Sequence, residues 1–276
     1  MTSTPEMKAK ADAFYALHHG LKAFIIPNPW DAGSARILAL LGFEALATTS
    51  AGFAFSLGEA DATVDRSTNI KGIADIATAT DLPVSADLEN GYGDAPDTVA
   101  ETIRRAAAAG AVGGSIEDAT GRRDDPIYAR AFAVERVRAA VHAARAQPFP
   151  FTLTARAENY LHGRQDLGDT IARLQAYQEA GADVLYAPGL ATRDEIAAVV
   201  RSVDRPVNVV MGLQGAQLSL EQLSSLGVRR VSVGGSLCRA AFGALLRAAR
   251  EMRERGTFTY AGDAVSHREL CRMFAR

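Results

Sequence analysis

Three acidic residues stand at or just after the ends of two short β-rich segments. Asp87 and Glu89 lie two residues apart at the end of segment 83–87, and Glu117 ends segment 113–117. Strand alternation aims Asp87 and Glu89 to one side, and crowded carboxylates raise one another's pKa unless a cation lies among them. Oxygen ligands without a nearby His or Cys suit Mg²⁺, or Mn²⁺, better than zinc. We therefore expect a metal site at these acids; the alternative is that they only reflect the polar ends of strands.

Basic and small residues near other strand ends favour an anionic ligand. Arg156 follows segment 151–155 and supplies a planar guanidinium that binds a carboxylate or phosphate through two hydrogen bonds. A salt bridge to Glu158 that only tethers the strand end is the alternative. The small residues of turn 49–52 offer backbone N–H groups to a carboxylate. Residues 234–236 open a predicted helix, where phosphate commonly binds, or form only a tight turn.

The segments that position these residues alternate in a regular rhythm. Runs rich in β-formers alternate with Ala-, Leu- and Arg-rich runs of helical spacing, and a glycine stands where four of the helices should end. Such alternation predicts parallel strands joined by right-handed crossovers, and eight units close into an α/β fold, the (β/α)₈ TIM barrel. An open doubly wound sheet is the alternative, although no dinucleotide glycine fingerprint follows the first strand. The predicted strands are 23–26, 45–48, 83–87, 113–117, 151–155, 184–187, 206–210 and 230–233, the helices include 97–109, 127–146, 167–180 and 236–255, and the glycines are Gly42, Gly110, Gly181 and Gly227.

The whole chain, residues 1–276, is predicted to form one barrel domain, because no linker rich in Pro, Gly or Ser divides it. Residues 256–276 extend past the last barrel helix, and 262–276 should form one further helix. The connections 52–71 and 119–125 are longer than the others. They lie at the end of the barrel that carries catalysis, where such loops often act as lids.

Composition and charge exclude several classes of protein. The formal net charge is -2, the pI is about 6.2, and no basic tract is interleaved with aromatic residues, so nucleic acid is not an expected partner. No apolar run approaches the roughly 20 residues that cross a bilayer, and the first residues do not form a signal peptide. Cys238 and Cys271 fit reduced thiols. We expect a cytoplasmic protein without a membrane partner, with His18 and His19 on its surface.

Taken together, these residues resemble the isocitrate lyase/phosphoenolpyruvate mutase superfamily. The resemblance covers most of the chain, and its specific part is "ADLENGYG" followed about thirty residues later by "IED". The phrases "SLGEAD" and "ARAE" add to it. The resemblance implies an enzyme that cleaves or forms a C–C or P–C bond next to a carboxylate, with Mg²⁺ as its cofactor and an enolate-like intermediate.

The resemblance assigns roles to the charged residues. By resemblance, Asp87, Glu89 and Glu117 correspond to the acids of the metal site. Asp61, in "SLGEAD", matches an aspartate close to the metal and to the reacting group. Arg156 matches the arginine that contacts the reacting end of the substrate. A cation and this arginine would stabilise the charge that develops on an enolate oxygen.

Substrate binding and assembly are also implied by the resemblance. Ser50, Ala51 and Gly52 match a turn whose backbone binds a substrate carboxylate, and Asn208 matches a polar residue of the lyase branch. Members are commonly tetramers in which a C-terminal helix packs on a neighbouring subunit. We therefore expect a homo-oligomer, a tetramer or a dimer, built through 256–276; packing of this helix on its own barrel is the alternative.

The predicted gate loop departs from the superfamily. Its sequence, "TGRRDDP", lacks the Cys and His of isocitrate and methylisocitrate lyases, and also the Lys-Thr-Asn motif of the mutase and phosphonopyruvate hydrolase branch. Pro188 stands where that branch has a histidine. Arg123 and Asp124 are the candidates for the catalytic role of the gate.

The sequence thus predicts a Mg²⁺-dependent lyase or hydrolase that cleaves a C–C bond in a small 2-oxo or 2-hydroxy carboxylate through an enolate-like intermediate. Two alternatives stay open. One is P–C bond chemistry of the phosphonomutase or phosphonopyruvate hydrolase type. The other is a barrel that binds a carboxylate without catalysis, which would promote no deuterium exchange into a keto acid.

Overall fold

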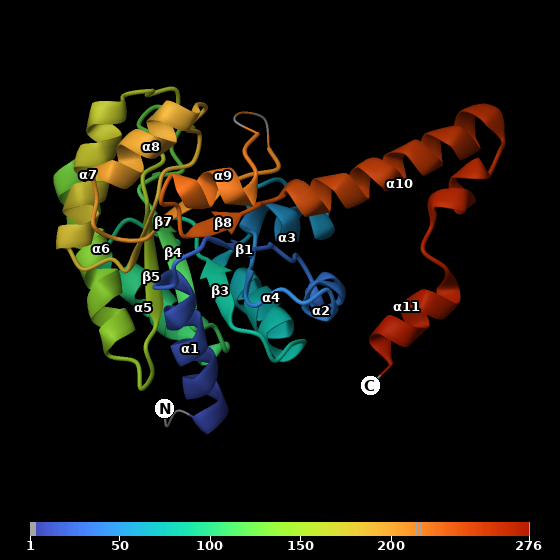
Figure 1. Ribbon diagram of the computed structural model, residues 1–276, viewed down its shortest axis with the longest axis horizontal. Helices are drawn as coiled ribbons and strands as arrows, with labels where there is room; N and C mark the ends of the chain where they lie inside the picture. Colours follow the sequence, from blue (N-terminus) through green and yellow to red (C-terminus); the bar gives the residue numbers. More distant parts are fainter. Residues whose placement is uncertain (1–3, 214, 216, 276) are drawn as a thin grey trace.

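Eight parallel strands surround one axis in the part of the chain that the structure describes, residues 4–213, 215 and 217–275 (Figure 1). This computed structural model confirms the (β/α)₈ barrel. Neighbouring strands follow the order β1-β8-β7-β6-β5-β4-β3-β2, and a hydrogen bond of 3.1 Å from the Ala47 N–H to the Pro27 carbonyl joins β2 to the end of β1. The strands are β1 (Phe24–Ile26), β2 (Leu46–Ala47), β3 (Val84–Asp87), β4 (Gly113–Glu117), β5 (Thr152–Arg156), β6 (Val184–Tyr186), β7 (Val207–Val210) and β8 (Arg230–Ser232).

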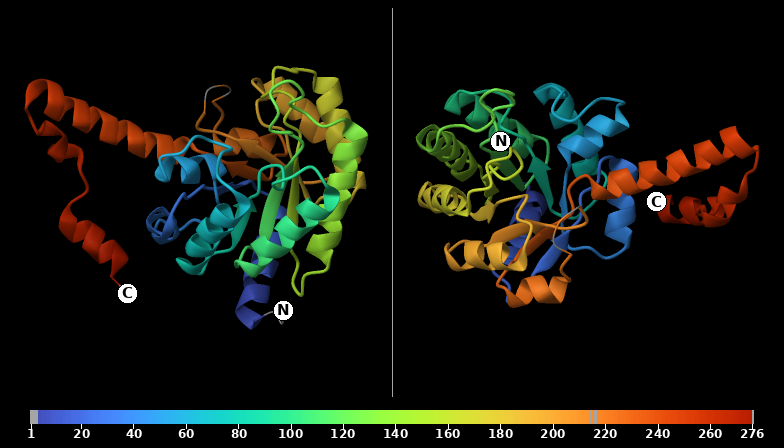
Figure 2. Two further views of the ribbon diagram at one scale, coloured as in Figure 1. Left: turned by 180° about the vertical axis from the view of Figure 1, so that it is seen from behind. Right: turned by 90° about the horizontal axis from the view of Figure 1, so that it is seen from above.

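Helices surround the strands (Figure 2) and end where local sequence signals place them. The four glycines predicted as helix stops all have positive φ, from 85° at Gly42 to 104° at Gly181, a conformation that costs glycine little. The helices are α1 (Pro5–His18), α2 (Ala32–Leu40), α3 (Ser50–Ser56), α4 (Arg66–Thr78), α5 (Pro96–Ala108), α6 (Arg130–Arg145), α7 (Leu167–Glu179), α8 (Arg193–Arg201), α9 (Leu220–Ser225), α10 (Ser236–Arg255), the 3₁₀ helix η1 (Thr259–Asp263) and α11 (His267–Phe274).

The expectation of one long loop over residues 52–71 is wrong in part. This segment contains most of α3 and the first turns of α4. The side chains of Thr49 and Asp65 accept hydrogen bonds from the first backbone N–H groups of these two helices, which is what an N-cap residue does. The irregular connection is therefore the shorter stretch 57–65.

Apolar side chains fill the layer between strands and helices, whereas the inside of the barrel is polar. On β5, Leu153 and Ala155 belong to the apolar layer, and alternation turns Thr152, Thr154 and Arg156 inward. The hydroxyls of both threonines are buried without a hydrogen-bond partner among the described residues. Barrel interiors are usually packed with branched apolar residues, so this interior is built differently.

His18 is buried, which contradicts the surface position expected from the sequence, whereas His19 is exposed as expected. His18 falls on the same face of α1 as Ala11 and Phe14, and that face packs on the barrel. Its Nδ1 lies 2.8 Å from the Phe14 carbonyl oxygen, and its Nε2 lies 3.4 Å from Nη1 of Arg230. Burial first, and then the charge of Arg230, lower the pKa of His18 to about 3.

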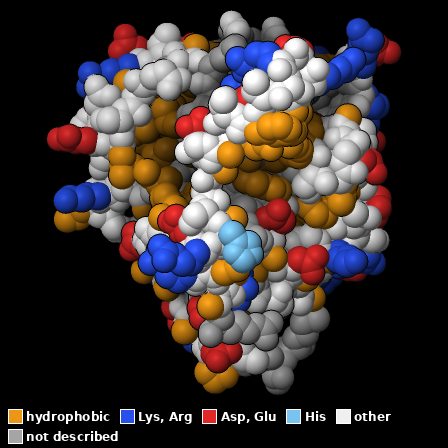
Figure 3. All heavy atoms as spheres, turned by 90° about the vertical axis from the view of Figure 1, so that its right-hand side faces the viewer, with side chains coloured by type: hydrophobic (Ala, Val, Ile, Leu, Met, Phe, Trp, Pro, Cys, Tyr) orange, Lys and Arg blue, Asp and Glu red, His pale blue; other side chains and the backbone are white. Residues whose placement is uncertain are grey.

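The C-terminal extension forms an arm beside the barrel. Helix α10 runs away from the strands, and the chain turns back at its outer end before η1 and α11 follow (Figures 1 and 2). Helix α11 approaches α2 of the same chain, and its Leu270, Met273 and Phe274 are half-buried. Apolar side chains are exposed on this side of the molecule (Figure 3). Among the helices that the structure describes, none has the length and apolar character needed to cross a membrane.

Replacing His18 with Gln should make the protein less sensitive to mild acid. The unfolded chain takes up a proton at His18 near its ordinary pKa of about 6.5, whereas the folded protein does not until pH falls to about 3. The free energy of unfolding is therefore highest above the pKa that His18 has in the unfolded chain. It falls by about 1.4 kcal/mol per pH unit as pH drops from there toward the pKa of His18 in the folded protein. Urea unfolding should show the advantage of wild type over His18→Gln shrinking between about pH 7 and about pH 5. An advantage that stays constant over this range contradicts the prediction.

Candidate active site

A cavity of about 510 Å³ opens among the C-terminal ends of the strands and reaches into the barrel. It brings together most of the predicted site residues, although they come from separate strands and loops. Those that line it are Ser50, Ala51, Asp61, Asp87, Glu89, Glu117, Arg156 and Asn208.

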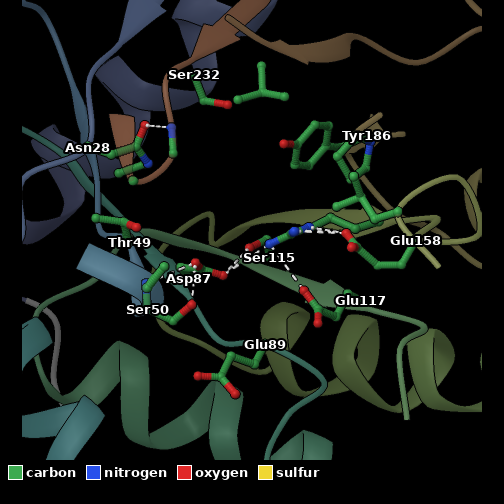
Figure 4. Close-up of a pocket in the computed structure, with 18 of the residues that line it drawn as sticks. Asn28, Thr49, Ser50, Asp87, Glu89, Ser115, Glu117, Glu158, Tyr186 and Ser232 are labelled. Atoms are coloured by element: carbon green, nitrogen blue, oxygen red, sulfur yellow. Dashed lines mark hydrogen bonds and ion pairs between the residues drawn. The ribbon is translucent and has the colours of Figure 1, made fainter. Parts of the chain in front are cut away.

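The guanidinium of Arg156 pairs with three carboxylates, those of Asp87, Glu117 and Glu158, which Figure 4 labels. Its Nη1 lies 3.2 Å from Asp87 Oδ1 and 3.2 Å from Glu117 Oε2. Its Nη2 lies 2.8 Å from Glu158 Oε1, so the salt bridge that the sequence left open is present together with two further ion pairs. The guanidinium carbon also lies 5.0 Å from the centre of the Tyr186 ring, within reach of a cation–π contact.

Asp87 is held by the chain that follows β2. Its Oδ2 accepts two hydrogen bonds of 3.0 Å from Ser50, one from the backbone N–H and one from the hydroxyl. Its own backbone N–H donates to Thr48 Oγ1 over 2.8 Å. With Oδ1 facing Arg156, both carboxylate oxygens are oriented by the protein itself.

Glu89 reaches the cavity by a route that strand alternation does not describe. It lies beyond the end of β3 with a φ of 49°, in the left-handed region that non-glycine residues rarely adopt. Burial, together with the charges of Asp87 and Asp61, raises the pKa of Glu89 to about 7. The Tyr92 hydroxyl lies 3.4 Å from Glu89 Oε1 and partly opposes that rise. Strained backbone of this kind is typical of functional sites.

Asp61 lies on the loop between α3 and α4 and faces the same cavity while remaining exposed to solvent. Partial burial, followed by the negative charge of Asp87, raises the pKa of Asp61. A carboxyl group in this setting holds its proton more readily than an ordinary aspartic acid.

The donor chemistry of the cluster fits a divalent metal ion. Burial raises the pKa of Glu117 well above its ordinary range and also raises that of Glu158, although a guanidinium lies beside both. One positive charge therefore does not balance the cluster. Among the described residues, no three His, Cys, Asp or Glu side chains stand close enough to hold an ion together. Since Mg²⁺ keeps several waters and takes one or two carboxylates, Asp87, Glu89 and Glu117 fit it as ligands that act partly through water.

The turn at Ser50, Ala51 and Gly52 only partly offers the predicted backbone cradle. The N–H of Ser50 donates to Asp87, and the N–H of Gly52 donates to Thr49 Oγ1 over 3.2 Å. Gly52 is buried and does not line the cavity; a Cβ there would meet Thr49 Cγ2 at 2.7 Å. Close packing of the first turn of α3 is therefore the reason for this glycine.

The gate loop is held by contacts that do not involve its two candidate catalytic residues. Arg123 and Asp124 are exposed and do not line the cavity. Arg122 instead pairs with Asp94, with Nη1 to carboxylate distances of 2.8 Å and 3.1 Å. The Tyr128 hydroxyl donates to the same carboxylate. In this conformation the Arg122–Asp94 pair holds the loop to the connection that follows β3 like a latch, and Arg123 and Asp124 lie outside the cavity lining.

Two cavity residues that contact predicted site residues, Tyr186 and Arg230, were not predicted from the sequence. Tyr186 supports the face of Arg156, and Arg230 lies at the start of β8, buried, with Nε 2.8 Å from Asn208 Oδ1. The run "RRVSV" carried a usable signal. In a barrel strand, alternation must turn one of two adjacent arginines inward.

Comparison with known proteins adds to this geometry. A family model described as phosphoenolpyruvate phosphomutase matches residues 14–253. The oxaloacetate decarboxylase of Bradyrhizobium sp. (strain BTAi1) is 31% identical over 233 residues, which are 82% of this chain and 78% of that protein. A structure from Burkholderia cenocepacia J2315, provisionally assigned as a lyase/mutase, is 69% identical, has a TM-score of 0.97 and covers 98% of both chains. A phosphonopyruvate hydrolase complex with oxalate and Mg²⁺ is 26% identical, has a TM-score of 0.85, and covers 99% of this chain and 95% of its own.

Replacing Glu89 with Gln should stabilise the protein at alkaline pH when metal is chelated. In the folded protein the pKa of Glu89 is about 7, above the ordinary value of 4.5 that applies to the unfolded chain. The free energy of unfolding is therefore highest below the unfolded-state pKa and falls as pH rises through the folded-state pKa. Glu89→Gln should therefore unfold with a free energy higher by about 1–3 kcal/mol at about pH 8, with a much smaller difference near pH 4.5. Urea unfolding in EDTA measures this, and a pH-independent difference contradicts it. Added Mg²⁺ should raise the melting temperature of wild type more than that of the variant.

Proposed function

Because the chain belongs to the phosphoenolpyruvate phosphomutase family, we propose that it is a Mg²⁺-dependent enzyme that cleaves a C–C bond in a small 2-oxo or 2-hydroxy carboxylate. One observation carries the proposal. Carboxylates from three chain segments, Asp87, Glu117 and Glu158, lie within 3.2 Å of one guanidinium. They do so in a cavity of a size that takes small molecules.

Oxaloacetate and substituted malates are the first substrates to test. The relative from Bradyrhizobium is an oxaloacetate decarboxylase, and the related phosphonopyruvate hydrolase was solved with oxalate and Mg²⁺. Cleavage of oxaloacetate at either of two C–C bonds gives pyruvate or oxalate. Both products are easily measured.

The residues of the cavity supply the remaining chemistry. When bound, Mg²⁺ contributes positive charge that stabilises an enolate-like oxyanion. Arg156 lies beside the same carboxylates and offers its guanidinium to that charge. Asp61, with its raised pKa, is suited to hold the proton that the substrate carbon takes up. Ala51 lines the cavity at the start of α3, and its backbone N–H is our candidate donor to a substrate carboxylate.

The gate loop, Ala119–Pro126, completes the proposal. Ala119 and Gly121 already line the cavity, so a small movement of the loop would exclude water from a reactive intermediate. Release of the Arg122–Asp94 latch would allow Arg123 or Asp124 to turn inward. These two residues remain our candidates for the gate's catalytic role.

Asp87→Asn should lose nearly all metal-dependent turnover, because the neutral amide does not bind Mg²⁺ as a charged ligand. We expect a fall of at least about 100-fold in kcat/KM, with the fold kept because Glu117 and Glu158 still pair with Arg156. Purified protein is incubated with keto and hydroxy acids, with and without Mg²⁺, and pyruvate, oxalate, glyoxylate and phosphate are followed. Asp81→Asn is the matched control, because Asp81 is exposed and precedes β3.

Three outcomes of that screen separate the alternatives. Phosphate released from phosphonopyruvate would move the assignment to P–C chemistry. Binding of keto acids without turnover or deuterium exchange would indicate a non-catalytic barrel. Unchanged turnover in Asp87→Asn would remove the metal site from the proposal.

We also propose that the C-terminal arm joins copies of this chain into a homo-oligomer. Leu245 and Leu246 on α10 are 59% and 52% exposed, and Phe258 after it is 66% exposed. Apolar side chains gathered on one arm are typical of a surface that another chain covers. A second copy, packed along α10, would bury them.

The double variant Leu245→Glu with Leu246→Glu should lower the mass measured by light scattering to that of a smaller assembly, because charge at a covered apolar contact is unfavourable. Leu21→Glu is the control, since Leu21 is 92% exposed on another part of the molecule. A monomeric mass for the unmodified protein, or an unchanged mass for the double variant, would overturn the proposal.

A further inference from the structure

Arg230 is a buried arginine that the proposed chemistry does not use. It is 5% exposed and forms no ion pair with any residue that the structure describes. Its hydrogen-bond partners are the neutral side chains of Asn208, 2.8 Å from Nε, and His18, 3.4 Å from Nη1. Charged side chains are almost never fully buried unless they are paired, so the missing counter-charge needs an explanation.

The guanidinium groups of the other arginines with little solvent exposure have either carboxylate partners or several backbone carbonyl partners among the described residues. Arg156 faces three carboxylates, and Arg173 pairs with Asp118 and Asp169 at 3.0 Å and 2.7 Å. Arg136 donates to three backbone carbonyls in the connection after β3 and does not line the cavity. Arg230 differs from all of them because it lines the cavity and has no anion beside it.

A continuous row of side chains connects Arg230 to the acidic cluster. The strand register pairs Glu117 with Arg156, then Arg156 with Tyr186, Tyr186 with Asn208, and Asn208 with Arg230. Residues paired in register point to the same side of a sheet, and in a barrel such a row runs obliquely because the strands are staggered. The row therefore leads from the acidic mouth of the cavity inward to Arg230, which touches His18 beneath the barrel.

Small side chains keep this route open. Ala47, Ser85, Ser115 and Ser232 line the cavity from the surrounding strands, at inward positions that branched apolar residues usually fill in such barrels. Burial, with a further contribution from the positive charge of Arg156, lowers the pKa of Arg230 to about 10. The positive charges of the two guanidinium groups, which line the same cavity, therefore repel each other.

We propose that Arg230 is the floor of an anion subsite that binds the carboxylate at the far end of a dicarboxylate substrate, while the acidic cluster at the mouth holds its 2-oxo or 2-hydroxy acid end. This inference rests on the proposed function and narrows its substrate class to diacids. The planar guanidinium is suited to a carboxylate through two hydrogen bonds. Asn208 Nδ2 donates to Ser232 Oγ over 3.0 Å, so Asn208 is fixed with its oxygen toward Arg230.

The test compares ligands that differ only at the far end. Malate and its 4-amide share the 2-hydroxy acid group, but the amide lacks the distal charge. Affinities are measured by titration calorimetry with Mg²⁺ present. The unmodified protein should bind malate at least about tenfold more tightly than the amide, because a charged group that loses its partner forfeits a charge-assisted hydrogen bond.

Arg230→Met should abolish that preference, and Arg229→Met is its matched control. Arg229 is the preceding residue, carries the same charge and does not line the cavity. Oxalate, too short to span the cavity, reports on the mouth alone and should bind wild type and both variants equally. Arg230→Lys keeps the charge and should retain part of the preference.

Each outcome bears on the inference. If oxalate binds but wild type does not distinguish malate from its amide, or Arg230→Met still distinguishes them, the subsite is refuted while the proposed function stands. If oxalate with Mg²⁺ does not bind wild type, the proposed function itself fails. If Arg230→Met does not fold, the other proteins still test the subsite. Wild type and Arg229→Met should then prefer malate to its 4-amide, and Arg230→Lys should show a smaller preference.

Discussion

The contact on which the site depends is the set of ion pairs around Arg156. Its guanidinium ties β3, β4 and the start of the loop after β5 together through Asp87, Glu117 and Glu158. Without it, three carboxylates with restricted solvent access would face one another, and breaking a buried pair commonly costs 3–5 kcal/mol, on the order of half a domain's stability. The cluster is therefore both a binding feature and a structural constraint.

Strand register places Asp87, Glu117 and Arg156, whereas Glu158 lies on the loop after β5. Glu117 stands opposite Arg156 in the β4–β5 ladder, and Asp87 stands opposite Ser115 in the β3–β4 ladder. Side chains paired in this way are held by the backbone hydrogen bonds of the sheet. The loops that follow the strands add orientation, as Ser50 does for Asp87, and they leave the gate free to differ from that of related enzymes.

Much of this could be predicted from the sequence because it is encoded locally. The strand positions agree with the prediction to within about a residue, and four helices end just before the glycines that were expected to stop them. The acids at the strand ends lie close together, as the carboxyl ends of neighbouring parallel strands require. The features that the sequence did not predict depend on distant parts of the chain. Burial of His18 requires the barrel end that packs against α1, and the positive φ of Glu89 requires the connection after β3. Arg123 and Asp124 lie outside the cavity lining while Arg122 pairs with Asp94, and their catalytic role stays a prediction.

The charge pattern of the cavity also explains why a cation and an anionic substrate should bind together. Among the described residues, five carboxylates line the cavity against two guanidinium groups, one at the mouth and one deep inside. A dianion approaching this mouth is repelled until protons or a divalent cation reduce the negative charge. With the cation that we propose in place, the mouth and Arg230 would both attract an anionic group, and a small diacid offers one such group at each end. In this proposal the interior arginine is the counterpart of the metal site, and the polar row of paired residues lies between them.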